Sequence, residues 1–152
     1  MITINIVAVG NLKEKFTRDM QDEYLKRISR FAKINVIEIA EKNRESNDSI
    51  TLSKEGKDIL AAIDGYPVLL DIGGKEYSST DFAKKISDLS QTTSKITFVI
   101  GSSCGVSDEV KSAIKDKMSF GKATFPHNLA RIMLEEQVYR AFTILNNVKY
   151  HK

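Results

Sequence analysis

The chain has 152 residues, of which 41% are hydrophobic and 28% are charged, which is ordinary for a globular domain that buries about two-thirds of its unfolded surface. It contains no run of about 18 apolar residues, which excludes a membrane-spanning helix, and its single cysteine excludes an internal disulfide. The net charge of +3, from 23 basic and 20 acidic residues, permits a nucleic-acid partner without requiring one.

The N-terminal stretch, MITINIVAVG, has neither a basic leader nor a small-residue cleavage site, so we expect a first strand there and no signal peptide. A lone cysteine suits the reducing cytosol, which predicts a cytoplasmic protein. The length predicts one domain over residues 1–152.

Strands and helices are expected to alternate along the chain. β-Branched and apolar runs predict strands at residues 2–9, 33–40, 66–72 and 95–100, with a brief apolar segment at 118–120. Apolar residues at intervals of three and four predict helices at residues 13–31, 50–63, 78–89, 107–117 and along the C-terminal segment. The apolar face of the first helix comprises Phe16, Met20, Tyr24, Ile28 and Phe31.

Turn-forming residues separate these elements. The polar stretch at 41–49 is the one segment expected to form a mobile loop, and Gly73-Gly74 is expected to end the third strand. Ser78 stands three residues ahead of Asp81, which is typical of a capped helix start. The alternation predicts an α/β fold with a mainly parallel sheet flanked by helices.

In such a sheet, ligands bind beyond the carboxyl ends of the strands. Three segments that contain glycine are expected there: DIGG at 71–74, GSSCG at 101–105 and FGKATFPH at 120–127. Glycine lets the backbone approach a ligand closely. Together the three loops predict a binding site without naming the ligand.

The GSSCG loop also matches the G-x-S-x-G pattern of serine hydrolases, in which Ser103 would be the nucleophile and His127 or His151 the base. The chain is small for that fold and no acidic third member stands out, so the hydrolase is the weaker alternative. Cys104 has no His or Arg nearby in sequence to activate it, which favours a plain loop residue. No phosphate-binding P-loop and no metal-ligand spacing occurs, so no metal is expected.

The C-terminal segment begins with Pro126-His127, where proline fixes φ and gives the helix a defined start. Its spacing predicts ion pairs of Glu135 with Arg131 and of Glu136 with Arg140. Its apolar face is wider than one small sheet needs, which suggests a second copy of the chain as partner. That face comprises Leu129, Met133, Leu134, Val138, Ala141, Phe142 and Leu145.

Several motifs together resemble one family. FPHNLARIMLEEQVYRAFTILNNVKYHK at the C-terminus, VIG followed by a glycine-containing loop, and AVGNLKEKF near the N-terminus are similar to the RlmH (YbeA-like) branch of the SPOUT methyltransferases. The resemblance covers essentially the whole chain. It implies an α/β knot with a C-terminal trefoil, S-adenosylmethionine as cofactor and an obligate homodimer. It also implies methylation of N3 of a pseudouridine in helix 69 of 23S ribosomal RNA, on assembled ribosomes.

The resemblance further implies a cofactor site in the three glycine-containing loops, with main-chain groups around the adenosine. The cofactor-binding residues it implies are Leu70, Gly101, Phe120, Gly121, Lys122, Ala123, Thr124 and Phe125. The sequence departs from the family pattern at Asn11, Ser102 and Cys104. Ser102 places a side chain where the family commonly has glycine, which puts its surroundings in doubt.

Methyl transfer depends on positioning, and the pseudouridine imide needs a base or a group that stabilises the developing anion. The catalytic candidates are His127, Arg131, Tyr150 and His151. His127 has a structural role in capping the helix as an alternative, and the sequence does not assign the base to one of the four. A non-catalytic ribosome-associated binding module of the same fold is the alternative from another functional class.

Three expectations follow from this reading. Gly101 lets the backbone reach the cofactor, so Gly101→Val abolishes cofactor binding in a folded dimer. An aspartate at Val138 or Phe142 breaks the dimer. The tail, Tyr150-His151-Lys152, reaches the cofactor site of the partner subunit, so that a chain without the tail and a chain without a cofactor site restore activity to each other.

Overall fold

The computed structural model describes residues 1–42 and 48–152. Within them, a five-stranded sheet has the order β2-β1-β4-β3-β5, and every neighbouring pair is parallel. The strands are β1 (Thr3–Val9), β2 (Lys33–Ile39), β3 (Tyr66–Glu76), β4 (Lys95–Ile100) and β5 (Lys117–Ser119). The predicted α/β class and its parallel sheet are thereby confirmed.

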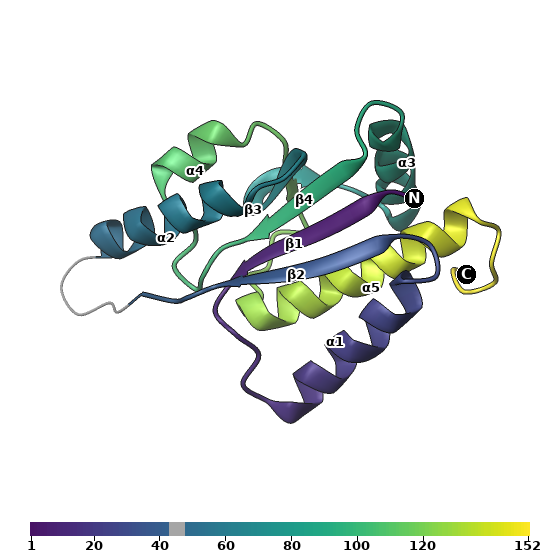
Figure 1. The fold of residues 1–152 in the computed structure, drawn as a ribbon, viewed down its shortest axis with the longest axis horizontal. Coiled ribbons are helices and arrows are strands. Elements are labelled where there is room, and N and C mark those ends of the chain that lie inside the picture. Colours follow the sequence, from purple (N-terminus) through teal and green to yellow (C-terminus); the bar gives the residue numbers. More distant parts are fainter. Residues whose placement is uncertain (43–47) are drawn as a thin grey trace.

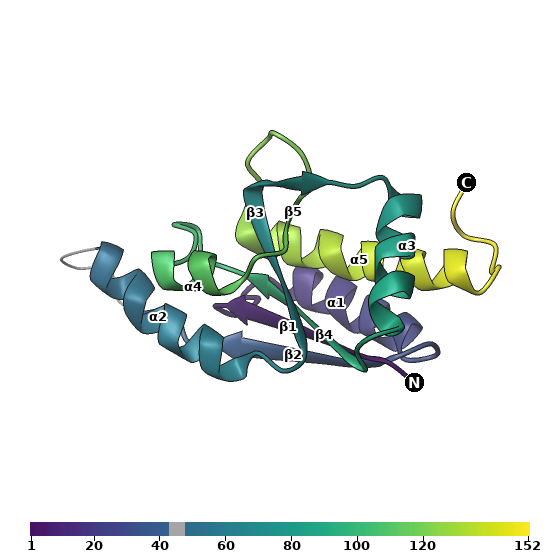
Figure 2. The ribbon, with the colours of Figure 1, turned by 90° about the horizontal axis from the view of Figure 1, so that it is seen from above.

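Helices cover both faces of the sheet (Figures 1 and 2). They are α1 (Lys15–Ile28), α2 (Asp48–Ala62), α3 (Ser79–Ser90), α4 (Asp108–Ala113) and α5 (His127–Leu145). One face packs against α1, α3 and α5, and α5 contacts both of the others. The opposite face packs against α2 and α4. In the described part of the chain, no helix is long and apolar enough to cross a bilayer.

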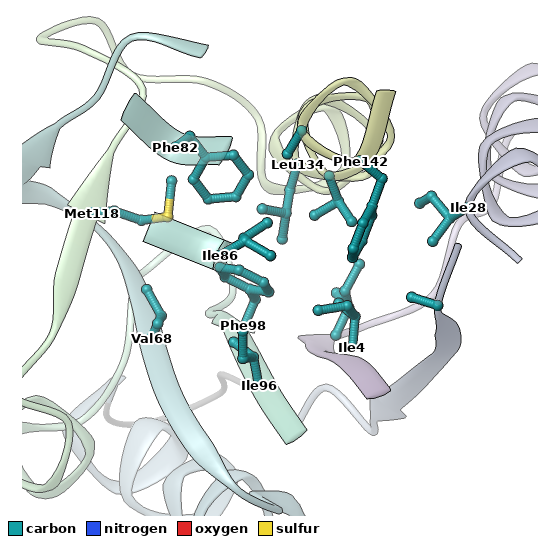
Figure 3. Packing of buried hydrophobic residues seen from close by; sticks show 14 of the residues in the cluster. Ile4, Ile28, Val68, Phe82, Ile86, Ile96, Phe98, Met118, Leu134 and Phe142 are labelled. Atoms are coloured by element: carbon teal, nitrogen blue, oxygen red, sulfur yellow. The ribbon is translucent and has the colours of Figure 1, made fainter. Parts of the chain in front are cut away.

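The larger core fills the space between the sheet and α5 (Figure 3). Phe98 from β4 meets Phe82 from α3 with ring centroids 5.8 Å apart. Leu134 and Phe142 reach down from α5 toward Ile4. Each of these side chains is at most 5% exposed. At roughly 1.5–3 kcal/mol per buried side chain, this layer accounts for much of the force that holds α5 on the sheet.

Serine caps start two of the helices. The Ser78 hydroxyl accepts the amide of Asp81 at the start of α3, as expected, and the Ser107 hydroxyl accepts the amide of Val110 at the start of α4, where no cap was predicted. Such caps satisfy amides that have no partner inside the helix. Both helices therefore begin directly after a serine whose side chain caps them.

The third strand corrects one prediction. Gly73-Gly74 does not end β3, which continues to Glu76 after a register shift between Leu70 and Lys75. A Cβ on Gly74 would lie 2.6 Å from main-chain atoms of Lys117 and Met118. Glycine is thus needed where β3 bulges and presses on β5, which is a use of glycine inside a strand.

Two helix predictions also need correction. The helix expected at 107–117 is only the six residues of α4, because Ile114 turns to extended backbone (φ −105°, ψ 106°) and is fully buried. In α1, Ile28 is buried but Phe16 and Met20 are 65% and 44% exposed, so two of the five residues of the predicted apolar face are not covered within the chain. The mobile loop expected at 41–49 falls mainly on 43–47, outside the described residues. The trefoil knot stays a prediction.

Candidate functional site

One cavity of about 270 Å³ opens at the carboxyl ends of β4 and β5, beside the register shift in β3. All three predicted glycine-containing segments contribute to its wall, and Asp71 and Ile72 represent the first of them. Seven of the eight predicted cofactor residues line it, and Lys122 does not: the seven are Leu70, Gly101, Phe120, Gly121, Ala123, Thr124 and Phe125. His127 and Ala130, from the start of α5, complete one side. The wall also contains residues that the sequence did not single out, among them Val106 and Ser119.

The loop between β5 and α5 is shaped by its own hydrogen bonds. The hydroxyl of Ser119 donates to the carbonyl of Gly121 at 2.9 Å and accepts the Gly121 amide at 3.1 Å. Gly121 has a φ of 135°, and a Cβ there would meet nothing within 4 Å. Glycine is therefore required at position 121 by the backbone conformation and not by a lack of space. The Ser119 hydroxyl and the positive φ of Gly121 thus set the path of the loop along the cavity.

Glycine is required at position 101 for a reason other than the expected close approach of the backbone to a ligand. A Cβ there would lie 2.5 Å from the carbonyl oxygen of Gly105 and 2.6 Å from Cγ1 of Val106. These atoms belong to the turn after β4, so Gly101→Val would disrupt the protein's own backbone before it met a ligand. Ser102 is 6% exposed, and its hydroxyl lies 3.4 Å from the Gly105 carbonyl and accepts the Cys104 amide at 3.4 Å. Its side chain thus supports the turn.

The Gly101–Gly105 turn does not have the form of a hydrolase nucleophile elbow. Ser102 and Gly105 form an isolated bridge, and α4 begins only at Asp108, so the helix does not follow the serine directly. Ser103 is exposed at the tip of the turn. The geometry gives no support to the hydrolase alternative.

His127 stands at the first position of α5, after Pro126 with φ −53° and ψ 136°. The Pro126 carbonyl accepts the Ala130 amide at 2.9 Å, which begins the helix as predicted. A Cβ built on Gly10 would lie 3.7 Å from Nε2 of His127. The imidazole therefore lies between the cavity and the turn after β1.

Arg131 is buried beneath this region and is only 1% exposed. Its guanidinium donates to Glu38 Oε2 at 2.7 Å and to the carbonyl of Gly10 at 2.9 Å. The predicted pair with Glu135 is wrong, because the guanidinium turns to partners on β2 and β1. Arg131 thus positions the turn after β1 against α5. Nothing in the sequence pattern marked Glu38 or Gly10 as its partners.

Glu135 is fully buried, and neither carboxyl oxygen has a hydrogen-bond partner within the described residues. Burial raises its pKa to about 8; the Arg131 charge opposes this increase and Asp22 adds to it. The carboxyl is therefore largely protonated at neutral pH. By contrast, Glu136 accepts Nε of Arg140 at 2.7 Å, which confirms the second predicted pair.

The remaining two catalytic candidates lie at the other end of α5. The ring of Tyr150 meets Tyr139 edge-on with centroids 4.7 Å apart, and the Arg140 guanidinium lies 4.8 Å from its centroid. His151 Nδ1 is 3.0 Å from Nη1 of Arg140. Burial and the Glu136 carboxylate raise the pKa of Tyr150, so its phenol is protonated at neutral pH. Neither residue lines the cavity within the same chain.

A second hollow, of about 400 Å³, runs along α5 between α1 and α3. Its apolar wall includes Met20 and Leu129, which are 44% and 45% exposed. By contrast, Val138 and Phe142, which we expected in an interface, are 0% and 5% exposed and belong to the core under α5. The wide apolar face of α5 thus divides into a buried side and an open side.

The comparisons with known proteins agree with this arrangement. A family model described as "Predicted SPOUT methyltransferase" matches residues 2–151. The "Ribosomal RNA large subunit methyltransferase H" of Fusobacterium nucleatum is 44% identical over 99% of this chain and 100% of its own length. The protein of the same name from Mycoplasmopsis synoviae is 48% identical, with the same two coverages.

Solved structures extend the likeness of fold. A tRNA (m1G37) methyltransferase from Aquifex aeolicus has a TM-score of 0.54 at 11% identity, over 91% of this chain and 69% of that one. A methyltransferase from Legionella pneumophila with bound cofactor SAM has a TM-score of 0.51 at 14% identity, over 92% of this chain and 66% of that one. At these identities the likeness concerns the fold alone.

Proposed function

The chain belongs to the SPOUT methyltransferase family, and from this premise we propose that it methylates N3 of a pseudouridine in helix 69 of 23S ribosomal RNA on assembled ribosomes. The broader activity is methylation of large-subunit ribosomal RNA with S-adenosylmethionine as donor. Residues 1–152 act as one SPOUT methyltransferase domain, which the single five-stranded sheet supports. Because its proposed substrate is the assembled ribosome, we propose that the protein acts in the cytoplasm.

The cavity at the ends of β4 and β5, beside the register shift in β3, is the observation that carries the proposal. Its volume of about 270 Å³ is close to the lower end of the range for small-molecule sites. Main-chain groups of the loop at 120–125 and of Gly101 suit the polar edges of an adenosine. Leu70 and Phe120 offer apolar contact to its base. The residues present therefore fit S-adenosylmethionine, which when bound supplies an electrophilic methyl group.

Side chains at the mouth of the cavity divide the remaining work. His127 is placed to orient or deprotonate the base that enters, since imidazole titrates near neutrality. Arg131 is a positioning residue: its bonds to Glu38 and Gly10 hold the turn after β1 beside His127. The transfer is an in-line displacement in which placement supplies much of the acceleration, and it requires no metal.

The protein acts as a homodimer in this proposal. The hollow along α5, with exposed Met20 and Leu129 on its wall, is where the second copy packs. Such a contact is isologous, because the same surface serves both chains. It brings the tail of one chain to the cavity of the other, so that Tyr150 and His151 complete a site in trans. The protonated phenol of Tyr150 then serves as a hydrogen-bond donor.

Mass spectrometry of the helix 69 fragment, from cells with and without the gene, tests the proposed reaction. We expect a methylated pseudouridine only where the gene is present, and its presence in both strains would contradict the proposal. Calorimetry with S-adenosylmethionine tests the alternative of a non-catalytic binding module. Absence of heat at millimolar cofactor would favour that module.

A further inference from the structure

A small surface cavity of about 200 Å³ lies at the C-terminal end of α1, away from the cofactor cavity. Its lining residues are Glu23, Lys26, Arg27, Arg30 and Tyr139, and we call the last four the basic cluster. The Arg27 guanidinium lies 5.7 Å from the ring centroid of Tyr24 and 5.6 Å from that of Tyr139. The rings of Tyr24 and Tyr139, which we call the aromatic floor, thus both lie within cation–π distance of the Arg27 guanidinium.

The cations of the cluster are mostly uncompensated. Arg27 has one carboxylate partner, Glu23 at 3.6 Å. Lys26 and Arg30 are exposed and form no salt bridge with any residue in the described ranges. Attraction to the negative end of α1 would account for basic residues in its last turn. It does not account for Arg30, which follows the end of the helix at Ile28, or for the aromatic floor.

The cluster is continuous with the tail. The floor residue Tyr139 contacts Tyr150 at 4.7 Å between centroids, and the Arg140 guanidinium, which pairs with Glu136, lies 4.8 Å from the centroid of Tyr150. Lys149 directly precedes Tyr150 in the sequence, Lys152 follows it by two positions, and both are exposed. Cations therefore run from the end of α1 to the residues that we assign to the partner's site.

Arginine and lysine bind phosphate oxygens strongly, and the guanidinium fork matches phosphate geometry. Aromatic rings beside such cations stack with bases in single-stranded nucleic acid. We infer that the basic cluster is a phosphate anchor for the ribosomal RNA whose target base enters the cofactor cavity of the partner subunit. This inference rests on the proposed function, because it takes the tail to work in trans.

The geometry sets the reach of the anchor. The cluster residue Tyr139 is 12 positions beyond His127, which lines the cofactor cavity, so about 18 Å of α5 separates them. In the dimer proposed above, the tail approaches the partner's cavity and the cluster moves with it. The anchor then holds RNA close to the reacting base, whereas within one chain it would hold RNA about 18 Å along the helix from the cavity.

The double variant Lys26→Gln/Arg30→Gln tests the anchor with undermethylated ribosomes as substrate. Its matched control is Lys54→Gln/Lys57→Gln, which removes two exposed cations from α2 on the other face. We expect the cluster variant to lose about tenfold in kcat/KM, and its salt slope for RNA binding to fall by between about 1 and 2. The control should change by less than about twofold. Equal effects in both variants, or none in the cluster variant, would overturn the anchor.

Filter binding to protein-free 23S ribosomal RNA, without cofactor, identifies what the cluster touches. A weaker affinity of the cluster variant supports a phosphate contact. A loss that appears only with whole ribosomes would assign the contact to an acidic ribosomal protein and overturn the inference. Because this readout needs no methyl transfer, a wild-type protein that methylates nothing would contradict the proposed function separately.

Mixed dimers test action in trans. The cluster variant is mixed with a chain that carries Ala123→Trp, which fills the cofactor cavity from an exposed position on its wall. In the mixed dimer, the one open cavity faces an intact cluster only if the cluster acts across the interface. Recovery of methylation to about a quarter of wild type or more supports this. If methylation does not recover although mass spectrometry shows subunit exchange, the cluster acts on the cavity of its own chain.

Discussion

The two ends of α5 are surrounded by different kinds of residues. At its start, three glycine-containing segments and His127 line the cofactor cavity, and Arg131 is bonded to Glu38 and Gly10. At its end, Tyr139, Arg140, Tyr150 and His151 present rings and cations to the surface. A cavity suits one small cofactor, whereas exposed rings and cations suit an extended polyanion. In the dimer proposed above, a second copy would bring the two kinds of surface together at one site.

An aspartate at each end of α5 should separate folding from assembly, with the largest expected effect at the tail end. Phe142→Asp puts a charge into the core and should leave little folded protein by circular dichroism, since truncating a buried Phe already costs about 3–5 kcal/mol. Leu129→Asp alters an exposed side chain and should give folded monomers in ultracentrifugation. A wild type that is monomeric at micromolar concentration would contradict the dimer.

Removing residues 150–152 tests the division directly. We expect ribosome methylation to fall by about 10³-fold or more, with dimerisation and S-adenosylmethionine affinity unchanged, because the cavity wall lies elsewhere. His151→Ala alone should lower the rate at saturating ribosomes by about 10²-fold, as is usual for a lost acid–base group. Methylation at the wild-type rate without the tail would remove Tyr150 and His151 from the mechanism.

Glu135, between the two ends, gives a prediction on pH. Its pKa of about 8 in the folded state exceeds its ordinary value, so the folded protein keeps a proton that the unfolded chain releases. The stabilisation that this proton gives to the folded state is fully present below about pH 4.5 and is lost as the pH rises through 8. Glu135→Gln should therefore raise the free energy of unfolding by roughly 3–5 kcal/mol at pH 9 and by little at pH 4.

Urea denaturation at the two pH values measures this difference. Glu136→Gln is the matched control, because Glu136 is the neighbouring carboxylate that has a partner, Arg140. We expect it to lower stability by less than about 1 kcal/mol at pH 9. If the two variants behaved alike, the Glu135 carboxyl would have a partner in solution.

The smallest effect is expected from Glu38→Gln, at the cavity end. Gln keeps one acceptor for Arg131 but removes the charge, and the Glu38 side chain is 43% exposed, so we expect a loss of about 1 kcal/mol in stability. If Arg131 positions the turn beside His127, kcat should fall severalfold while S-adenosylmethionine affinity is retained. A lower cofactor affinity with unchanged kcat would contradict that role.

The sequence predicted the strands well, because buried parallel strands require apolar, β-branched runs such as the one at 95–100. It predicted two loops of the cavity because their glycines follow β4 and β5, whereas the third segment, at 71–74, lies inside β3. Helical spacing identified the partner of Arg140 but misled for Arg131, whose partners are 93 and 121 positions away. Gly73-Gly74 misled for a related reason: a bulge against β5 and a turn both use glycine. Interactions that depend on distant residues leave no local pattern.

The hydrogen bond from Arg131 to Gly10 also has a consequence for how the chain folds during its synthesis. It joins positions 121 apart, so the turn after β1 cannot be completed until most of the chain has left the ribosome. The same holds for the core beneath α5, since Leu134 and Phe142 meet Ile4 there. Long-range contacts of this kind make folding slow and expose apolar strands in the meantime. A nascent chain that stops before α5 therefore leaves the part of its sheet that α5 covers exposed between α1 and α3, as a target for chaperones and proteases.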